Sequence, residues 1–268
     1  MKFISKLCYI LLFLGHSVWA QHSASPQVSS FMIEAPQLDT LKKIWIYLPD
    51  TYENTTQSYP VIYMHDAQNL FDKATSFAGE WEVDESLDSL ENLEAIIVGI
   101  EHGNEKRIEE LTPFPNDEYG GGKALDYLNF IRNTLKPHID ASYRTLADRD
   151  HTGIWGSSLG GLTSFYATLK FPDIFSFAGV YSPSFWYSDE IYDFVSKIDL
   201  PDTKYYFLAG DSESKNMLED LEKMLDLLKS KGLTENNIRV EIVKGGEHNE
   251  KLWREAFANT YLWLLENK

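Results

Sequence analysis

Short apolar runs alternate along this chain with segments whose apolar residues recur every three or four positions. Residues 60–65 and 95–100 are largely continuous apolar runs, which are typical of strands buried on both faces of a sheet. Residues 125–135 follow the helical spacing instead, and we expect Pro137 to end that helix. Further strand-like segments are 44–48, 152–155, 177–181, 205–209 and 238–243, and further helix-like segments are 218–228 and 253–264. This alternation predicts βαβ units, with a mostly parallel central sheet and helices on both faces.

The start of the chain has the pattern of a secretory signal peptide. Two lysines precede the apolar run 7–15, and small or medium residues ending at Ala20 offer a cleavage site. We therefore expect residues 1–20 to be removed and the protein to be exported to the periplasm or the outside of the cell. A retained N-terminal anchor is the alternative. Residues 21–30 are small and polar and are expected to precede the fold, and the length of 21–268 suits one α/β domain.

Charge and cysteine content narrow the possible partners. The net charge of −17 becomes more negative by two when the two lysines of the leader are removed, which argues against nucleic acid and anionic membranes. Cys8 is the only cysteine and lies in the leader, so the mature chain has no disulfides. No second apolar stretch is long enough for a membrane span, so we expect no membrane insertion after cleavage. The sequence indicates no oligomeric state.

Residues 156–160, with the sequence Gly-Ser-Ser-Leu-Gly, match the pattern G-x-S-x-G centred on Ser158. A strand-like segment precedes the motif and a helix-like segment, 162–170, follows it. This strand, turn and helix context is the one in which a nucleophilic serine is exposed at a sharp turn of an α/β-hydrolase. The alternative is an ordinary turn rich in glycine and serine. The motif predicts the α/β-hydrolase fold with Ser158 as the nucleophile.

A base and an acid must accompany such a serine, and in this fold they follow it in the order Asp or Glu, then His. His248 is the only histidine after Ser158, and it lies in a glycine-containing loop. The acid should follow a strand, and both Asp211 and Glu213 come directly after the segment 205–209. Its role is to orient the imidazole and to stabilise its charged form.

The negative oxygen that forms during attack on a carbonyl requires two backbone N–H donors. One is expected from Leu159, the residue after the nucleophile. The loop after the run 60–64 should supply the other, and Gln68 is our candidate. Residues His65, Asp66 and Asp72 could alternatively form a metal site. No second cluster of His or Cys offers further ligands, so we expect no metal and assign to His65 the bracing of the loop.

Several motifs occur together in one order, and with them the chain resembles a known esterase family. That family includes feruloyl and acetyl-xylan esterases, the enterobactin (ferric siderophore) esterases and the mycolyltransferases. The resemblance runs from about Leu41 to Leu265. Its marks are the segments 44–49, 60–71, 79–81, 143–145, 156–161, 182–186 and 246–248.

The resemblance implies site residues and an activity. It implies a triad of Ser158, Glu213 and His248, because the family's acid usually falls three residues after the glycine that ends the strand. The family's oxyanion residue aligns with Gln68. Ala67 stands where the family often has glycine, and a positive φ there would cost about 1–2 kcal/mol. The implied mechanism passes through an acyl-enzyme and uses no cofactor.

Aromatic residues near the strand ends suggest a substrate class. Trp186 and Trp81 are candidate substrate-binding residues, because aromatic faces suit sugar rings or a feruloyl group, although core packing would explain them equally well. We expect an exported serine carboxylic-ester hydrolase that removes acetyl or feruloyl groups from polysaccharides or oligosaccharides. A siderophore esterase is the closest alternative, and the acidic charge counts against it. An acyltransferase and a non-catalytic carbohydrate-binding protein on the same fold are further alternatives.

Overall fold

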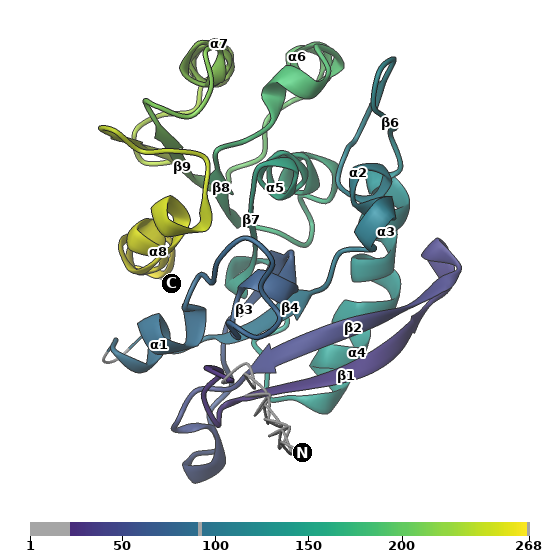
Figure 1. Cartoon of the computed structure of the whole chain (residues 1–268), viewed down its shortest axis with the longest axis vertical. Coiled ribbons are helices and arrows are strands. Elements are labelled where there is room, and N and C mark those ends of the chain that lie inside the picture. Colours follow the sequence, from purple (N-terminus) through teal and green to yellow (C-terminus); the bar gives the residue numbers. More distant parts are fainter. Residues whose placement is uncertain (1–21, 91–92, 267–268) are drawn as a thin grey trace, which may run out of the picture.

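The computed structural model describes residues 22–90 and 93–266, and the expected leader, residues 1–20, lies outside them. Within the described ranges, no helix is both long and apolar enough to span a membrane. One sheet of eight strands in the order β1-β2-β4-β3-β7-β8-β9-β10 forms the centre (Figure 1). The strands are β1 (Val28–Ala35), β2 (Thr40–Tyr47), β3 (Val61–His65), β4 (Ile96–Ile100), β7 (Thr152–Ser157), β8 (Phe177–Tyr181), β9 (Lys204–Gly210) and β10 (Ile238–Val243).

The sheet is parallel from β4 through β10, and the antiparallel pairs are β1 with β2 and β2 with β4. The mostly parallel α/β sheet predicted from the alternating pattern is thus confirmed. Strand β1 was not predicted, and its first residues, 28–30, fall in the segment expected to precede the fold. The reason is that β1 is an edge strand with several exposed polar side chains, so it lacks the apolar signal of the central strands.

Helices cover both faces of the sheet, as predicted. Helices α1 (Val83–Asp88) and α8 (Glu250–Leu265) pack on one face in one apolar cluster, and residues of the remaining long helices pack on the other face. Figure 1 shows α8 and α3 on opposite sides of the sheet. The other helices are α2 (Arg107–Glu110), α3 (Ala124–Phe130), α4 (Lys136–Ser142), α5 (Leu159–Lys170), α6 (Glu190–Lys197) and α7 (Met217–Ser230).

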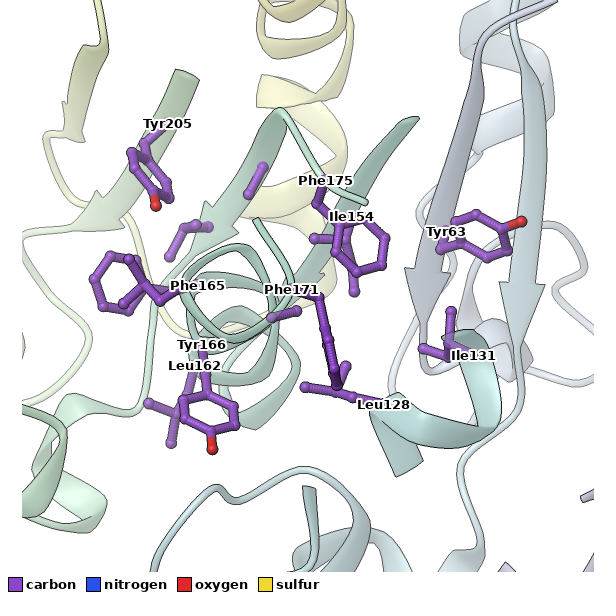
Figure 2. Packing of buried hydrophobic residues seen from close by; sticks show 14 of the residues in the cluster. Tyr63, Leu128, Ile131, Ile154, Leu162, Phe165, Tyr166, Phe171, Phe175 and Tyr205 are labelled. Atoms are coloured by element: carbon purple, nitrogen blue, oxygen red, sulfur yellow. The ribbon is translucent and has the colours of Figure 1, made fainter. Parts of the chain in front are cut away.

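Aromatic side chains fill the space between α5 and the sheet. Figure 2 shows Phe165 of α5 beside Tyr205 of β9, with ring centres 5.5 Å apart. Phe175 meets Tyr63 of β3 edge-on at 6.4 Å. Burying rings of this size contributes strongly to the hydrophobic stabilisation of the domain. Helix α5, which follows Ser158 directly, is therefore held against the sheet by buried aromatic side chains.

Pro137 does not end the helix, contrary to the prediction. A π-helical segment, Ile131–Leu135, joins α3 to α4, and Pro137 lies in the first turn of α4. Proline lacks an N–H and its ring crowds the carbonyl four residues before it. The wider π turn precedes the proline, so the chain continues in helical form through a position where a regular α-helix would be interrupted.

The order of the strands places one crevice at the carboxyl ends of β3 and β7. The chain runs from β3 outward to β4 and then returns to the other side of β3 as β7. The two strands are parallel neighbours, with Met64 paired to Trp155 near their ends. Ligands of open α/β sheets bind where the strand order reverses in this way. The loop after β3 and the serine turn after β7 therefore lie side by side.

A buried ion pair joins the antiparallel part of the sheet to the loop after β4. Lys42 of β2 contacts the carboxylate of Glu110 at the end of α2 at 2.6 Å, and both side chains are buried. The N–H of Gly103 donates to the same carboxylate oxygen at 2.8 Å. Burial lowers the pKa of Lys42, and the charge of Glu110 opposes that shift. This arrangement costs desolvation but leaves no charge without a partner.

Removing one member of that pair should destabilise the fold strongly. We expect Lys42→Met to lower the free energy of unfolding by about 3–5 kcal/mol, because Glu110 is left buried without its cation. The neighbouring Lys43 pairs with Glu101 at 3.2 Å in a more exposed position, and Lys43→Met should cost less than about 1 kcal/mol. Urea denaturation of both variants measures the difference, and equal losses would contradict the assigned role of burial.

Candidate active site

Ser158 occupies a strained turn between β7 and α5. Its backbone has φ 58° and ψ −121°, a region that residues other than glycine rarely adopt. Its N–H donates to the carbonyl of Tyr181 at 2.9 Å, and its carbonyl accepts from the N–H groups of Leu162 and Ser184. These bonds hold a conformation that costs on the order of 1–3 kcal/mol. The geometry matches the strand, turn and helix context that the G-x-S-x-G motif predicted.

Two glycines allow the close packing around this turn. A Cβ atom on Gly156 would lie 2.8 Å from Cδ2 of His65, and one on Gly161 would lie 2.6 Å from the carbonyl oxygen of Tyr181. Both distances are too short for real contacts. Helix α5 therefore reaches the sheet only because these positions have no side chain. Gly156 belongs to the motif itself and Gly161 directly follows its last glycine, so the close packing requires small residues on both sides of the serine, including one just beyond the motif.

His248 and Glu213 are in direct contact. Nδ1 of His248 lies 2.6 Å from Oε2 of Glu213, whose side chain is fully buried. The other oxygen, Oε1, accepts from the hydroxyl of Ser182 at 2.7 Å and from the N–H of Gly210 at 2.6 Å. Trp253 donates to Ser182 from Nε1 and stands edge-on to the imidazole, with ring centres 5.1 Å apart. Both partners of this contact are therefore held in place: the carboxylate by Ser182 and Gly210, and the imidazole by Trp253.

Asp211, the other acid that the sequence left open, does not contact the imidazole. Its Oδ1 accepts from the N–H of Gly245 at 2.6 Å and from the hydroxyl of Ser212 at 3.1 Å. Gly245 belongs to the loop between β10 and α8 that carries His248. Asp211 thus shapes this loop, whereas Glu213 touches the ring itself.

Two adjoining hollows meet at Ser158 and His248. The first has a volume of about 400 Å³ and the second about 590 Å³, and both residues line both hollows. The hydroxyl oxygen of Ser158 lies 3.3 Å from that of Ser184 at the boundary of the second hollow. Prominent residues of the first hollow are Phe77, Trp81, His102, Arg107 and Glu250, and those of the second are Ser184, Trp186 and Met217.

The two expected oxyanion donors lie on neighbouring elements. Leu159 begins α5, and Gln68 lies in the 3-10 turn Ala67–Asn69 after β3. Within the described residues, neither of these two N–H groups donates a hydrogen bond. The left-handed residue of this loop is Asp66, with φ 57°, and Ala67 is not in the positive-φ region. The departure from glycine at position 67 therefore carries no backbone strain.

The two tryptophans proposed for substrate binding differ in exposure. Trp81 is only 3% exposed and stacks on Tyr181, with ring centres 5.6 Å apart, so core packing accounts for most of its surface. Trp186 is 50% exposed and lines the second hollow, and its ring also meets that of Tyr119 edge-on. Of the two, Trp186 is the one with a free face for a ligand.

Several residues of the first hollow were not identified from the sequence. Arg107 forms a bidentate ion pair with Asp66, and Glu250 accepts from the side chain of Asn69 at 3.1 Å. Burial raises the pKa of Glu250. Phe77 is 68% exposed at the rim. These residues lie on loops or at the first turn of helices, where no periodic pattern marks them.

His65 lies beneath the serine turn and is almost fully buried. Its Nδ1 lies 2.8 Å from the hydroxyl of Tyr127, and burial lowers its pKa to about 4. Asp72 is turned away from it and contacts His22 and the N–H of Ser23. In the part of the chain that the structure describes, no three His, Cys, Asp or Glu side chains are placed to hold a metal ion.

The parallel sheet, the helices on both faces and the turn at Ser158 define an α/β-hydrolase. Residues 35–264 match the model of the family described as "Putative esterase". The chain belongs to this esterase family and is a carboxylic ester hydrolase. The family expected from the motifs is thereby confirmed.

Known relatives agree with this membership. A Bacillus subtilis (strain 168) protein, "Uncharacterized protein YbbA", is 30% identical over 83% of this chain and 92% of its own length. An "Endo-1,4-beta-xylanase/feruloyl esterase" of Xylanibacter ruminicola is 24% identical over 79% of this chain, which spans only 27% of that larger protein. The structure of an enterochelin esterase from Shigella flexneri shares the fold with a TM-score of 0.72 at 16% identity, covering 91% of this chain and 59% of that one.

The contacts of the two acids predict different effects of isosteric substitutions. Glu213→Gln should lower kcat/KM for an ester by about 100-fold to 10,000-fold, because the amide no longer stabilises a charged imidazole or fixes its tautomer. Asp211→Asn should stay within about tenfold of the parent, since its carbonyl oxygen still accepts from Gly245. Steady-state kinetics on both purified variants measures this, and the reverse ranking would assign the acid to Asp211.

The buried imidazole of His65 predicts a pH-dependent stability. Its pKa of about 4 lies below the usual 6.5, so the unfolded chain binds the proton first as the pH falls. Stability from this group is present above pH 6.5 and is lost between about pH 6.5 and 4, by about 3 kcal/mol.

Urea denaturation at several pH values measures this loss. We expect the parent to lose about 3 kcal/mol more than His65→Gln between pH 7 and 4. The exposed His138 provides the control, and His138→Gln should keep the pH dependence of the parent. Parallel curves for the parent and His65→Gln would rule out a neutral, buried His65.

Proposed function

We propose that this protein is an exported serine esterase in which Ser158 attacks the ester, His248 is its base and Glu213 orients the base. One observation carries the proposal: the buried carboxylate of Glu213 contacts Nδ1 of His248 within a site that also contains the strained Ser158. With Nδ1 bound to the carboxylate, Nε2 is the nitrogen that is free to accept a proton from a serine hydroxyl.

The proposed acylation uses these residues in turn. His248 removes the hydroxyl proton of Ser158 as Oγ of Ser158 attacks the carbonyl carbon of the ester. The electrons of the carbonyl double bond move to the carbonyl oxygen, which becomes the oxyanion. The N–H groups of Leu159 and Gln68 then donate to that oxyanion, which is also favoured by the positive end of the α5 dipole. His248 returns the proton to the alcohol as the carbon–oxygen bond breaks, and an acyl-serine remains.

Deacylation repeats the same steps with water as the nucleophile. His248 takes a proton from water, the hydroxide attacks the acyl-serine and the same two N–H groups bind the oxyanion. The proton then returns to Ser158 as the acid product leaves. Glu213 accepts the hydrogen bond from Nδ1 and stabilises the imidazolium in both half-reactions.

The walls of the two hollows support acylated saccharides as substrates. Phe77 and Trp186 offer exposed aromatic faces on either side of the serine, and such faces suit sugar rings or a feruloyl group. Arg107 and Glu250 add a donor and an acceptor for hydroxyl groups in the first hollow. The feruloyl esterase relative supports the same class. We propose acetyl or feruloyl esters of polysaccharides or oligosaccharides.

A siderophore ester is the competing substrate, and the enterochelin esterase shares this fold. Catecholate groups are anionic, and the strongly negative net charge disfavours them. The cation in the first hollow, Arg107, is already neutralised by Asp66. These two features favour the saccharide ester.

Export is the second part of the proposal, and the leader pattern over residues 1–20 supports it. The mature enzyme would then begin at Gln21 and act in the periplasm or outside the cell. An enzyme in that place meets polymer-derived esters before they enter the cell, which fits the proposed substrate.

The decisive experiment compares the mature chain, 21–268, with Ser158→Ala. We expect hydrolysis of p-nitrophenyl acetate by the parent and a loss of about 1,000-fold or more in the variant, because the nucleophile is missing. A fluorophosphonate probe should label only the parent. Failure of the probe to label Ser158 would instead favour a non-catalytic carbohydrate-binding protein.

A panel of esters then separates the substrates. Acetylated or feruloylated xylo-oligosaccharides should give a higher kcat/KM than p-nitrophenyl acetate, because the hollows bind the sugar or feruloyl group. A catecholate trilactone that is hydrolysed faster than every saccharide ester would favour the siderophore function.

A further inference from the structure

The loop that carries Gln68 is tied to the loop after β4 by two pairs of hydrogen bonds. The side chain of Gln68 donates from Nε2 to the carbonyl of His102 at 3.3 Å, and its Oε1 accepts from the N–H of His102 at 3.3 Å. The second pair involves Asp66, which lies two residues before Gln68. Arg107 donates from Nε and Nη2 to the two carboxylate oxygens of Asp66, at 2.7 and 2.9 Å. We call these four bonds the loop clamp.

The loop clamp holds Asp66, the residue of the loop whose backbone is strained. Asp66 has a left-handed backbone, and the next turn presents the N–H of Gln68. The carboxylate of Asp66 lies over the start of α5, because a Cβ on Gly160 would be 3.4 Å from its Oδ2. Burial alone would raise the pKa of Asp66, whereas the Arg107 guanidinium holds that pKa below its usual range. Arg107 therefore keeps a charged, strained residue in place beside the serine turn.

We propose that Arg107 is a positioning residue for the oxyanion site, acting through Asp66 and together with the Gln68–His102 pair. This inference rests on the proposed function, in which the N–H of Gln68 receives the oxyanion. The charge on that oxygen develops only in the transition state. A displaced N–H should therefore lower kcat and leave substrate binding largely unchanged.

A direct substrate contact is the competing role, since Arg107 also lines the first hollow. A guanidinium that binds the substrate in the ground state would mainly raise KM when it is removed. The two roles therefore separate in the kinetic constants.

The test measures kcat and KM for a simple ester in the mature enzyme. Arg107→Met should lower kcat by about 10-fold to 100-fold, less than the full loss of an oxyanion donor, with KM within about threefold of the parent. Arg107→Lys should recover part of kcat, because lysine restores the charge but not the bidentate geometry. The matched control is Arg132→Met, whose exposed pair with Asp173 lies away from the site and whose kinetics should not change.

A second variant tests the clamp from its other side. Gln68→Ala removes the side-chain bonds to His102 but keeps the backbone N–H, so it should also lower kcat with little change in KM. If both ties hold the same loop, Arg107→Met with Gln68→Ala should lower kcat by less than the product of the two single effects. Circular dichroism and thermal unfolding establish that the variants are folded. If Arg107→Met does not fold, the two single variants Gln68→Ala and Arg107→Lys suffice to test the positioning role.

The outcomes distinguish the inference from the proposed function. A parent without Ser158-dependent activity overturns the proposed function. An active parent whose kcat survives both Arg107→Met and Gln68→Ala overturns the positioning role alone. A rise in KM of tenfold or more at constant kcat assigns Arg107 to substrate contact instead.

Discussion

The strained backbone of Ser158 is the constraint around which the rest of the molecule is arranged. The turn is held by its bond to the carbonyl of Tyr181 on the neighbouring strand β8. Tyr181 is itself buried between Trp81 and Trp155, and its hydroxyl donates to Thr260 of α8. Helix α8 and the strand beside the turn thus form one packed unit. A position that costs free energy locally persists because the surrounding core leaves the chain no alternative conformation.

The Glu213 carboxylate is likewise held in place by its surroundings. The side chain of Glu213 is fully buried, yet its oxygens accept hydrogen bonds from Ser182 and the Gly210 amide and contact Nδ1 of His248, so its charge is compensated. Trp253 fixes both Ser182 and the face of the imidazole. The partners come from three distant segments that meet only at the carboxyl ends of the strands. A buried carboxylate with all its partners in place holds an imidazole in one orientation far better than an exposed one, because it cannot exchange those partners for water.

Buried charge recurs on the other side of the serine, in the loop after β4. Glu110 pairs with Lys42 of the sheet, and three residues before it Arg107 pairs with Asp66 of the proposed oxyanion loop. One short segment therefore links the antiparallel edge of the sheet to the loop that carries Asp66. Breaking either ion pair would leave a buried carboxylate, that of Glu110 or Asp66, without its cation. Because both losses are unfavourable, the segment is held in place at both of its ends.

The sequence by itself determined the α/β class and the esterase family and predicted Ser158 and His248 as site residues, because periodicity, turn chemistry and the order of motifs can be read along the chain. It left Asp211 and Glu213 as alternatives, since two acids that are two residues apart have the same local pattern. Only the tertiary structure decided which of them meets the imidazole, which tryptophan is buried, and that Arg107 reaches Asp66. These outcomes depend on how the ends of adjacent strands and their loops pack in space, and no spacing along the chain records that packing.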